Sequence, residues 1–152
     1  MTDLHEDRAQ DHVEDSLKQV MDIIARQRLV ESLVHNQDMP RHELVENLVH
    51  RQNLNELAKK LDDLHPADVA YILEALPPED RIMVWDLVKA ERDGEILIEV
   101  SDAVRESLIA TMDNRELVAA ASTLDTDEIA DLAADLPKDV VQELMESMDE
   151  AK

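Results

Sequence analysis

Carboxylates are the side chains of this sequence most able to do chemistry. The chain has 152 residues, of which 37 are Asp or Glu and 15 are Lys or Arg, so its formal net charge is −22 at pH 7. Asp127 and Asp131 are spaced four residues apart, so on a helix both carboxylates share one face and repel each other unless a cation sits nearby. The same acidity argues against binding to the phosphate backbone of a nucleic acid.

Histidines offer a second, weaker possibility. His42, Glu46 and His50 recur at intervals of four residues on a predicted helix, a spacing that could ligate zinc or nickel through imidazole. Such spacing also arises on solvated helix faces, and the sequence contains no HExxH motif. His65 precedes Pro66, and we expect it to start a helix rather than to bind a metal.

Other site chemistries are excluded by composition. The single glycine, Gly94, rules out GxGxxG and Walker-type phosphate loops, which need several glycines. The absence of cysteine rules out disulfides, thiolate zinc sites and thiol nucleophiles, and fits a reducing compartment. No GxSxG or other local catalytic signature is present, and a glycosidase-like acid pair cannot be singled out from so acidic a background. We therefore expect the protein not to be an enzyme.

The elements that would position the acids follow a repeat of twelve residues. Apolar residues recur every twelve positions in two series. Twelve residues turn a helix by about 1200°, which is about 120° away from the starting face, so one continuous helix could not keep residues twelve positions apart buried on one side. The chain must break once per unit, and we expect breaks at 65, 77, 89, 101, 113, 125 and 137. Asp113 with Glu116, and Asp125 with Glu128, have the spacing of capping boxes. One series of apolar positions is Leu64, Leu76, Val88, Val100, Met112, Leu124, Leu136 and Met148, and the other is Ile72, Val84, Ile96, Leu108, Ala120, Leu132 and Leu144.

The sequence therefore predicts an all-α protein, with a solenoid of about seven short helices of roughly 9 to 11 residues. We expect an irregular helix start near Gly94 and core positions for Trp85, Met112, Met145 and Met148. A longer amphipathic helix over about 12–36 precedes the repeat. Helices capped by Asp38 and by Asn53 follow that long helix. The predicted division is an acidic helical lead at 1–53 and a solenoid domain at 54–150.

Three segments of the repeat resemble a known family. Residues 64–70 read LHPADVA, residues 73–81 read LEALPPEDR, and residues 124–132 read LDTDEIADL. These segments are similar to the amino-terminal cytosolic domain of MgtE magnesium transporters, over about 54–148. The resemblance implies a right-handed superhelix of short helices in a cytoplasmic domain at the membrane face. It also implies three partners: a CBS domain pair, a transmembrane channel and, in the full-length protein only, a second copy as a homodimer.

The resemblance also implies a function and a ligand. In this family Mg²⁺, bound between this domain and the CBS pair, holds the channel closed. By motif match, the metal-contacting acids are Glu95, in the segment GEIL, and Asp127 with Asp131, in the segment DEIAD. A weak site of mostly outer-sphere contacts needs abundant acid rather than a cage, because Mg²⁺ keeps several waters.

Two other functions stay open from the sequence. One is an interaction scaffold without metal sensing, like the armadillo-like modules of flagellar rotor switch proteins. The other is a transition-metal protein that uses His42 and His50. A sensor should gather its acids on one face near 95 and 127–131, whereas a scaffold should expose an apolar groove.

Overall fold

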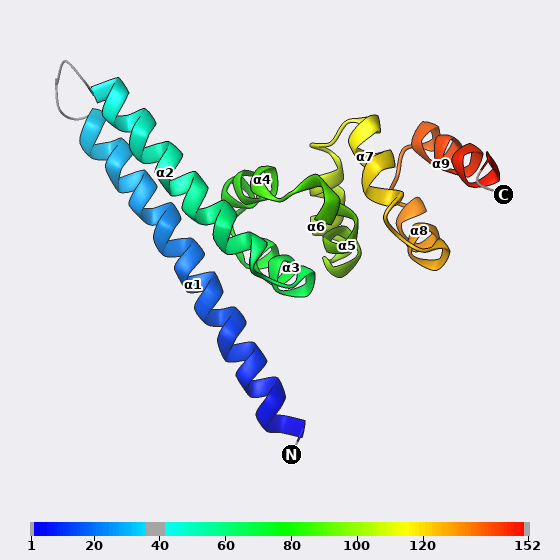
Figure 1. Cartoon of the computed structure of the whole chain (residues 1–152), viewed down its shortest axis with the longest axis horizontal. Coiled ribbons are helices and arrows are strands. Elements are labelled where there is room, and N and C mark those ends of the chain that lie inside the picture. The colour runs from blue at the N-terminus through cyan, green and yellow to red at the C-terminus, as the bar shows by residue number, and fades with distance from the viewer. Residues whose placement is uncertain (1, 36–41, 151–152) are drawn as a thin grey trace. The chain divides into compact units, whose positions relative to one another are not determined.

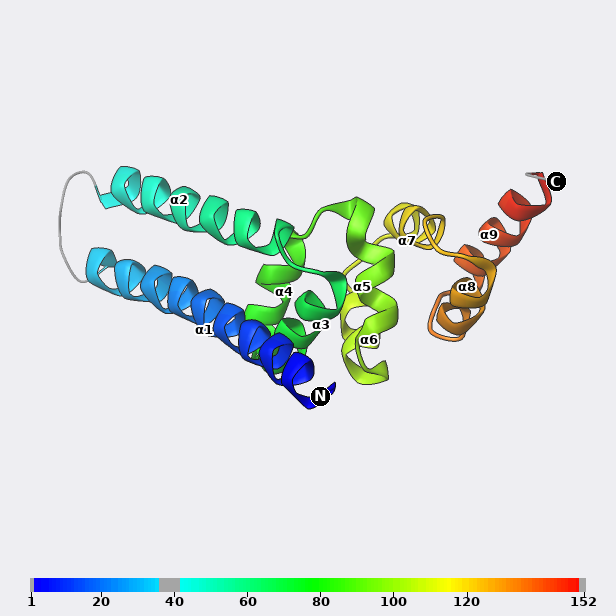
Figure 2. The ribbon, with the colours of Figure 1, turned by 60° about the horizontal axis from the view of Figure 1, so that its bottom comes forward.

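The computed structural model describes residues 2–35 and 42–150. It describes the side chains and their burial for residues 12–32 and 48–147. The described chain forms helices and no strand, so the predicted all-α class is confirmed. The chain divides into two compact units, Met1–Leu64 and His65–Lys152. Figures 1 and 2 show the helices of each unit.

The first unit is a hairpin of two long helices, α1 (Thr2–His35) and α2 (His42–Asp62), which pack against each other. Val20, Ile23 and Ile24 are buried on α1, and Leu57 and Leu61 are buried on α2. Helix α1 begins ten residues before the start predicted for it at 12. The expected Asp38 cap lies outside the described residues.

The predicted helix start at Asn53 is wrong. Helix α2 runs through this position without a break. Asn53 is 4% exposed, and its Nδ2 donates a hydrogen bond to Oε1 of Gln27 on α1 at 2.6 Å. The Nε2 of Gln27 also lies 2.8 Å from Nδ1 of His50. Asn53 is therefore a buried polar contact between the two helices of the hairpin, and no helix terminus is present for it to cap.

The second unit is a stack of short helices, as the repeat predicted. The helices are α3 (Pro66–Ala75), α4 (Pro78–Leu87), the 3₁₀ turn η1 (Ala90–Arg92) continuing into α5 (Asp93–Glu99), α6 (Asp102–Ile109), α7 (Asn114–Ala121), α8 (Thr126–Ala133) and α9 (Lys138–Glu150). Every second helix packs against the next one in this series: α3 contacts α5, α5 contacts α7, and α7 contacts α9. Helix α5 also packs against α6 and α8.

The seven breaks fall at the predicted positions. At 65, 77, 89, 101, 113 and 125 the residue before the next helix has ψ between 135° and 172°. At 77, 89 and 101 the preceding residue (Leu76, Val88 or Val100) is extended as well. Because these residues redirect the chain, each short helix can turn the same apolar face to its neighbours. The second apolar series is buried throughout, from Ile72 at 0% exposed to Leu144 at 4%. In the first series Val88 is half-buried, and the Met148 side chain lies outside the described ones.

The irregular start predicted near Gly94 is confirmed by η1, which opens the unit before α5. Trp85 and Met112 are in the core, as expected, at 5% and 9% exposed. The core position predicted for Met145 is wrong, because this side chain is 63% exposed. Its neighbour Leu144 takes the inward position of α9, and one further residue turns the helix about 100° toward solvent.

Candidate functional site

The three predicted acids lie on two helices that pack against each other. Glu95 is on α5, and Asp127 and Asp131 are on α8, with α5 and α8 in contact. All three side chains are exposed. The structure thus brings the two helices together while leaving the carboxylates free to meet solvent or a partner.

Two of the acids, Glu95 and Asp131, are directed outward by the buried residues that follow them. On α5, Ile96 and Leu97 are both 0% exposed, so the preceding Glu95 faces away from the core. On α8, Leu132 is 0% exposed and directly follows Asp131. Burial of the aliphatic side chains therefore fixes the direction of the carboxylates.

A capping box fixes the start of α8. Oδ1 of Asp125 accepts from the backbone N–H of Glu128 at 2.9 Å, and Oε1 of Glu128 accepts from the backbone N–H of Asp125 at 3.2 Å. Both contacts satisfy amides that a helix start leaves without partners. At the start of α7, Asp113 accepts from the N–H of Glu116 at 2.8 Å. The predicted cap positions at 113 and 125 are therefore confirmed.

The acids make an open arrangement rather than a cage. Among the residues that the structure describes, no group of three or more His, Asp or Glu side chains is arranged to hold a metal ion. Exposed carboxylate oxygens nevertheless suit a hydrated Mg²⁺, because this hard ion keeps several waters and is often held by one or two carboxylates. The donor set fits a weak, largely outer-sphere contact.

Asp93 is an acid that the sequence analysis missed. It is 9% exposed, at a position of the twelve-residue register where Val69 and Leu117 are 0% and 2% exposed. The units on either side carry Arg81 and Arg105 at this position, and both are half-buried. Burial, and then the negative charge of Glu116, raise the pKa of Asp93 to about 7. No local signal marks it, because the units on either side carry Arg81 and Arg105 at the same register position.

Gly94 explains how α5 can lie so close to α7. A Cβ at this position would clash with the backbone oxygen of Ala120 and would lie 2.8 Å from Oγ1 of Thr123. Only glycine leaves room for this approach of the two helices. Gly94, near which the sequence predicted an irregular helix start, is therefore also a close packing contact.

The histidines have structural partners. His65 caps α3 as predicted, because its Nδ1 accepts from the N–H of Ala67 at 3.1 Å. His50 faces Gln27 within the hairpin. The side chains of His42 and Glu46 lie outside the described ones, so the proposed metal triplet stays a prediction.

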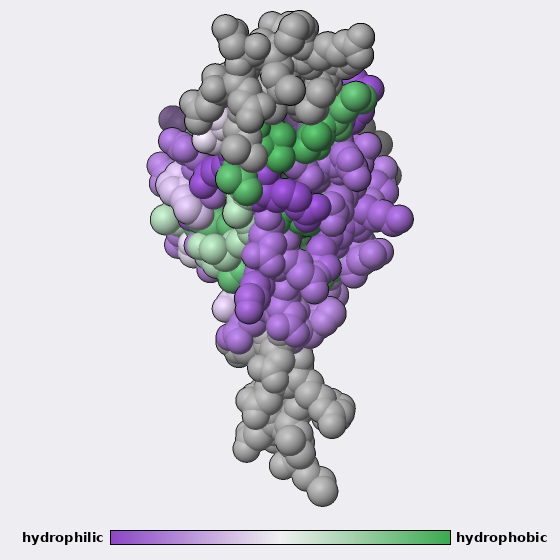
Figure 3. Space-filling view, turned by 90° about the vertical axis from the view of Figure 1, so that its left-hand side faces the viewer, coloured by the Kyte–Doolittle hydropathy of each residue, from purple (hydrophilic) through white to green (hydrophobic). Residues whose placement is uncertain are grey.

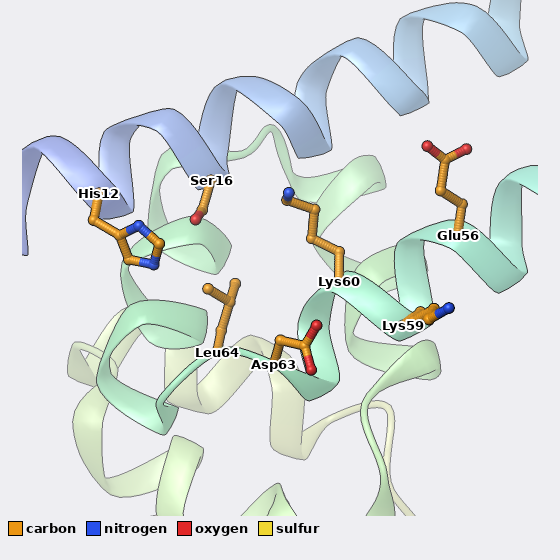
Figure 4. Close-up of a pocket in the computed structure, with 7 residues that line it drawn as sticks. All are labelled: His12, Ser16, Glu56, Lys59, Lys60, Asp63 and Leu64. Atoms are coloured by element: carbon orange, nitrogen blue, oxygen red, sulfur yellow. The ribbon is translucent and has the colours of Figure 1, made fainter.

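The hairpin also contains a pocket of about 440 Å³ (Figure 4). His12, Ser16 and Leu64 line it together with two lysines, Lys59 and Lys60, and two acids, Glu56 and Asp63. Glu56 is paired with Arg26 at 3.4 Å. Because cations and anions are balanced around the pocket, its lining does not favour a ligand of either charge.

The face seen in Figure 3 is mainly hydrophilic, and its hydrophobic residues gather in a band and a smaller patch. No helix in the described part of the chain combines the length and the apolar character needed to cross a membrane. The large exposed apolar side chains are few in the described residues: Met21, Leu29, Leu48, Tyr71 and Met145. Three of them lie on the hairpin and two on the helical stack.

Comparison with known proteins gives one finding for the second unit. The family model of the MgtE intracellular N domain matches residues 64–152. The search of curated proteins finds no match to the chain. The matched range covers α3 to α9, including all three predicted acids.

Proposed function

The chain belongs to the MgtE intracellular N domain family, and on that premise we propose that it is a magnesium-sensing regulatory domain of a magnesium transporter or channel. The family is part of transporters and is not a class of enzymes. The observation that carries the proposal is the match over 64–152, which spans more than half of the chain.

In the proposed mechanism, Glu95, Asp127 and Asp131 bind hydrated Mg²⁺ together with acids of a CBS domain pair. The bound cation screens the repulsion between the two acidic surfaces, so the two parts dock and a pore in the transmembrane part closes. When Mg²⁺ leaves, the carboxylates repel and the domain separates. The charge of residues 64–152, with 23 acids against 7 bases, or −16, supports this mechanism because it makes docking without a cation unfavourable.

A ligand can shift an equilibrium only by the difference in its affinity for the two states. Magnesium therefore controls closure only if the docked state binds it more tightly than the separated state. A site shared between two acidic surfaces meets this condition, since each surface alone supplies half of the ligands. The isolated chain should accordingly bind Mg²⁺ weakly.

The test is a thermal melt of the chain in 10 mM MgCl₂ and in NaCl of matched ionic strength. With a Kd in the millimolar range, Mg²⁺ should add on the order of 1 kcal/mol beyond the effect of NaCl. The variant Glu95→Gln/Asp127→Asn/Asp131→Asn should lose this magnesium-specific part. Equal shifts in the two salts for the unchanged protein would argue against a magnesium site in this chain.

The control variant removes the same charge elsewhere on the second unit. Glu79, Asp86 and Glu143 are exposed, and Glu79→Gln/Asp86→Asn/Glu143→Gln removes the same number of negative charges, three. It should keep the magnesium-specific shift. Loss of the shift in both variants would indicate general screening of the acidic surface, which an interaction scaffold without metal sensing would also show.

A further inference from the structure

Arg105 lies in the first turns of α6, and its side chain is only 11% exposed. Its Nε donates to the carbonyl of Leu97 at 2.7 Å, and its Nη2 lies 3.3 and 3.4 Å from the carbonyls of Ile98 and Val100. These carbonyls belong to the end of α5, where a helix has no partners of its own for them. Arg105 therefore caps the C-terminal end of α5.

The same guanidinium reaches a second helix. Its Nη1 donates to Oδ2 of Asp135 at 3.2 Å, in the turn that follows α8. The Asp135 side chain is 29% exposed, so this ion pair is partly shielded from water. Arg105 also lies 3.5 Å from Asp102, but that carboxylate is 94% exposed and contributes little. A planar guanidinium with five N–H donors can hold both helices at once.

The two helices that Arg105 joins carry the candidate acids. Its carbonyl partner Leu97 is two residues beyond Glu95 on α5, and its carboxylate partner Asp135 is four residues beyond Asp131. We propose that Arg105 and Asp135 are positioning residues, which fix α5 against α8 and so hold Glu95, Asp127 and Asp131 as one face. The inference rests on the proposed function, because it concerns the arrangement of that same face.

Arg81 provides a matched comparison within the chain. It lies 24 residues, or two repeats, before Arg105, and it caps the preceding helix in the same way. Its Nε donates to the carbonyl of Leu73 at 2.7 Å, and its Nη2 donates to the carbonyl of Leu76 at 3.1 Å. Replacing Arg81 removes an equivalent cap from α3 without touching the contacts of Arg105 to α5 and Asp135.

The first experiment measures the position of α5 relative to α8. The chain has no cysteine, so Glu99→Cys and Ala130→Cys, at exposed positions on the two helices, accept one spin label each. Double electron–electron resonance on the full chain should give one narrow distance distribution. Asp135→Ala is a milder change than replacing Arg105, because it leaves the Arg105 cap in place. It should at least double the width of the distance distribution, whereas Arg81→Met should leave that width unchanged. An unchanged width in Asp135→Ala would overturn the proposal.

The second experiment separates positioning from stability. Asp135→Ala, without labels, should lose at least half of the magnesium-specific shift in melting temperature, while Arg81→Met should keep the shift even though it lowers the melting temperature itself. A full shift in Asp135→Ala would overturn the positioning role. If the label distances broaden in Asp135→Ala but the unchanged protein shows no magnesium-specific shift, the proposed function fails and the link between α5 and α8 stands.

Discussion

Position 93 holds a carboxyl that is 9% exposed, at a register position where Val69 and Leu117 are buried and Arg81 and Arg105 are half-buried. The fold favours the protonated form of this group, since burial raises its pKa from 3.8 to about 7. Between these two pH values the folded protein binds more protons than the unfolded chain, so the contribution of Asp93 to stability falls as the pH rises from about 4 to 7. Above pH 7 the loss is complete.

The variant Asp93→Asn should remove this dependence. At pH 8 it should be more stable than the unchanged protein by on the order of 1–2 kcal/mol, because the amide carries no charge to bury. At pH 4 the two should differ little. Urea unfolding at both pH values measures this, with the exposed Asp86→Asn as the control. A gain of the same size at both pH values would contradict the assignment to ionisation.

Replacing Gly94 by alanine should change the stability in the direction opposite to that usual for a glycine in a helix. Replacing a glycine inside a helix by alanine normally stabilises by about 1 kcal/mol. Here the new Cβ would meet the backbone oxygen of Ala120, which cannot move without shifting α7. Gly94→Ala should therefore destabilise by about 1–3 kcal/mol. Thermal unfolding decides between the two signs, and a stabilised variant would show that α5 and α7 are not packed so closely.

The packing of α1 against α2 includes a buried hydrogen bond between Asn53 and Gln27. Asn53→Ala should cost about 1–3 kcal/mol, because it leaves Gln27 without the donor at 2.6 Å in a buried setting. Replacing both residues by leucine should cost less, because neither buried amide is then left unpaired and only His50 and Glu31, both half-buried, lose a contact with Gln27. Chemical denaturation of the three proteins measures this. Equal losses in the single and double variants would show that the hydrogen bond itself is not what matters.

The elements most completely predictable from the sequence are the short helices. The twelve-residue step fixed each break, because a helix turns 120° too far over that length and must restart. The hairpin was less predictable. Asn53 has the residue type of a helix cap, yet the neighbour that satisfies it, Gln27, lies 26 positions away and only the fold brings the two together. Side-chain type alone cannot distinguish a cap from a buried contact.

The sequence predicted which acids form the candidate site, but not the ion pair between Arg105 and Asp135. Its acids were identified from motif resemblance, and the structure places them on the surface of adjacent helices. The ion pair that joins those helices spans 30 residues, from Arg105 to Asp135. Local spacing carries no signal for a contact of this range. Asp93 was missed because acids are so frequent in this chain that one more did not stand out.

For the whole molecule, the central quantity is charge. A surface of −16 on the second unit resists approach to another acidic body, and a divalent cation held at a few carboxylates lowers that resistance. Control of closure by a site requires the cation to gather at α5 and α8 rather than to spread over the entire surface. General screening would make every exposed acid equivalent.

The most direct measurement uses Mn²⁺ in place of Mg²⁺ and follows the amide signals of the ¹⁵N-labelled chain by nuclear magnetic resonance. A bound paramagnetic ion broadens the signals near it, so substoichiometric Mn²⁺ should broaden residues 93–99 and 125–133 first, and excess Mg²⁺ should restore them. In Asp127→Asn/Asp131→Asn the broadening at 125–133 should disappear. Broadening spread evenly over the acids of the second unit, or centred on another segment, would contradict the assignment of the site to Glu95, Asp127 and Asp131.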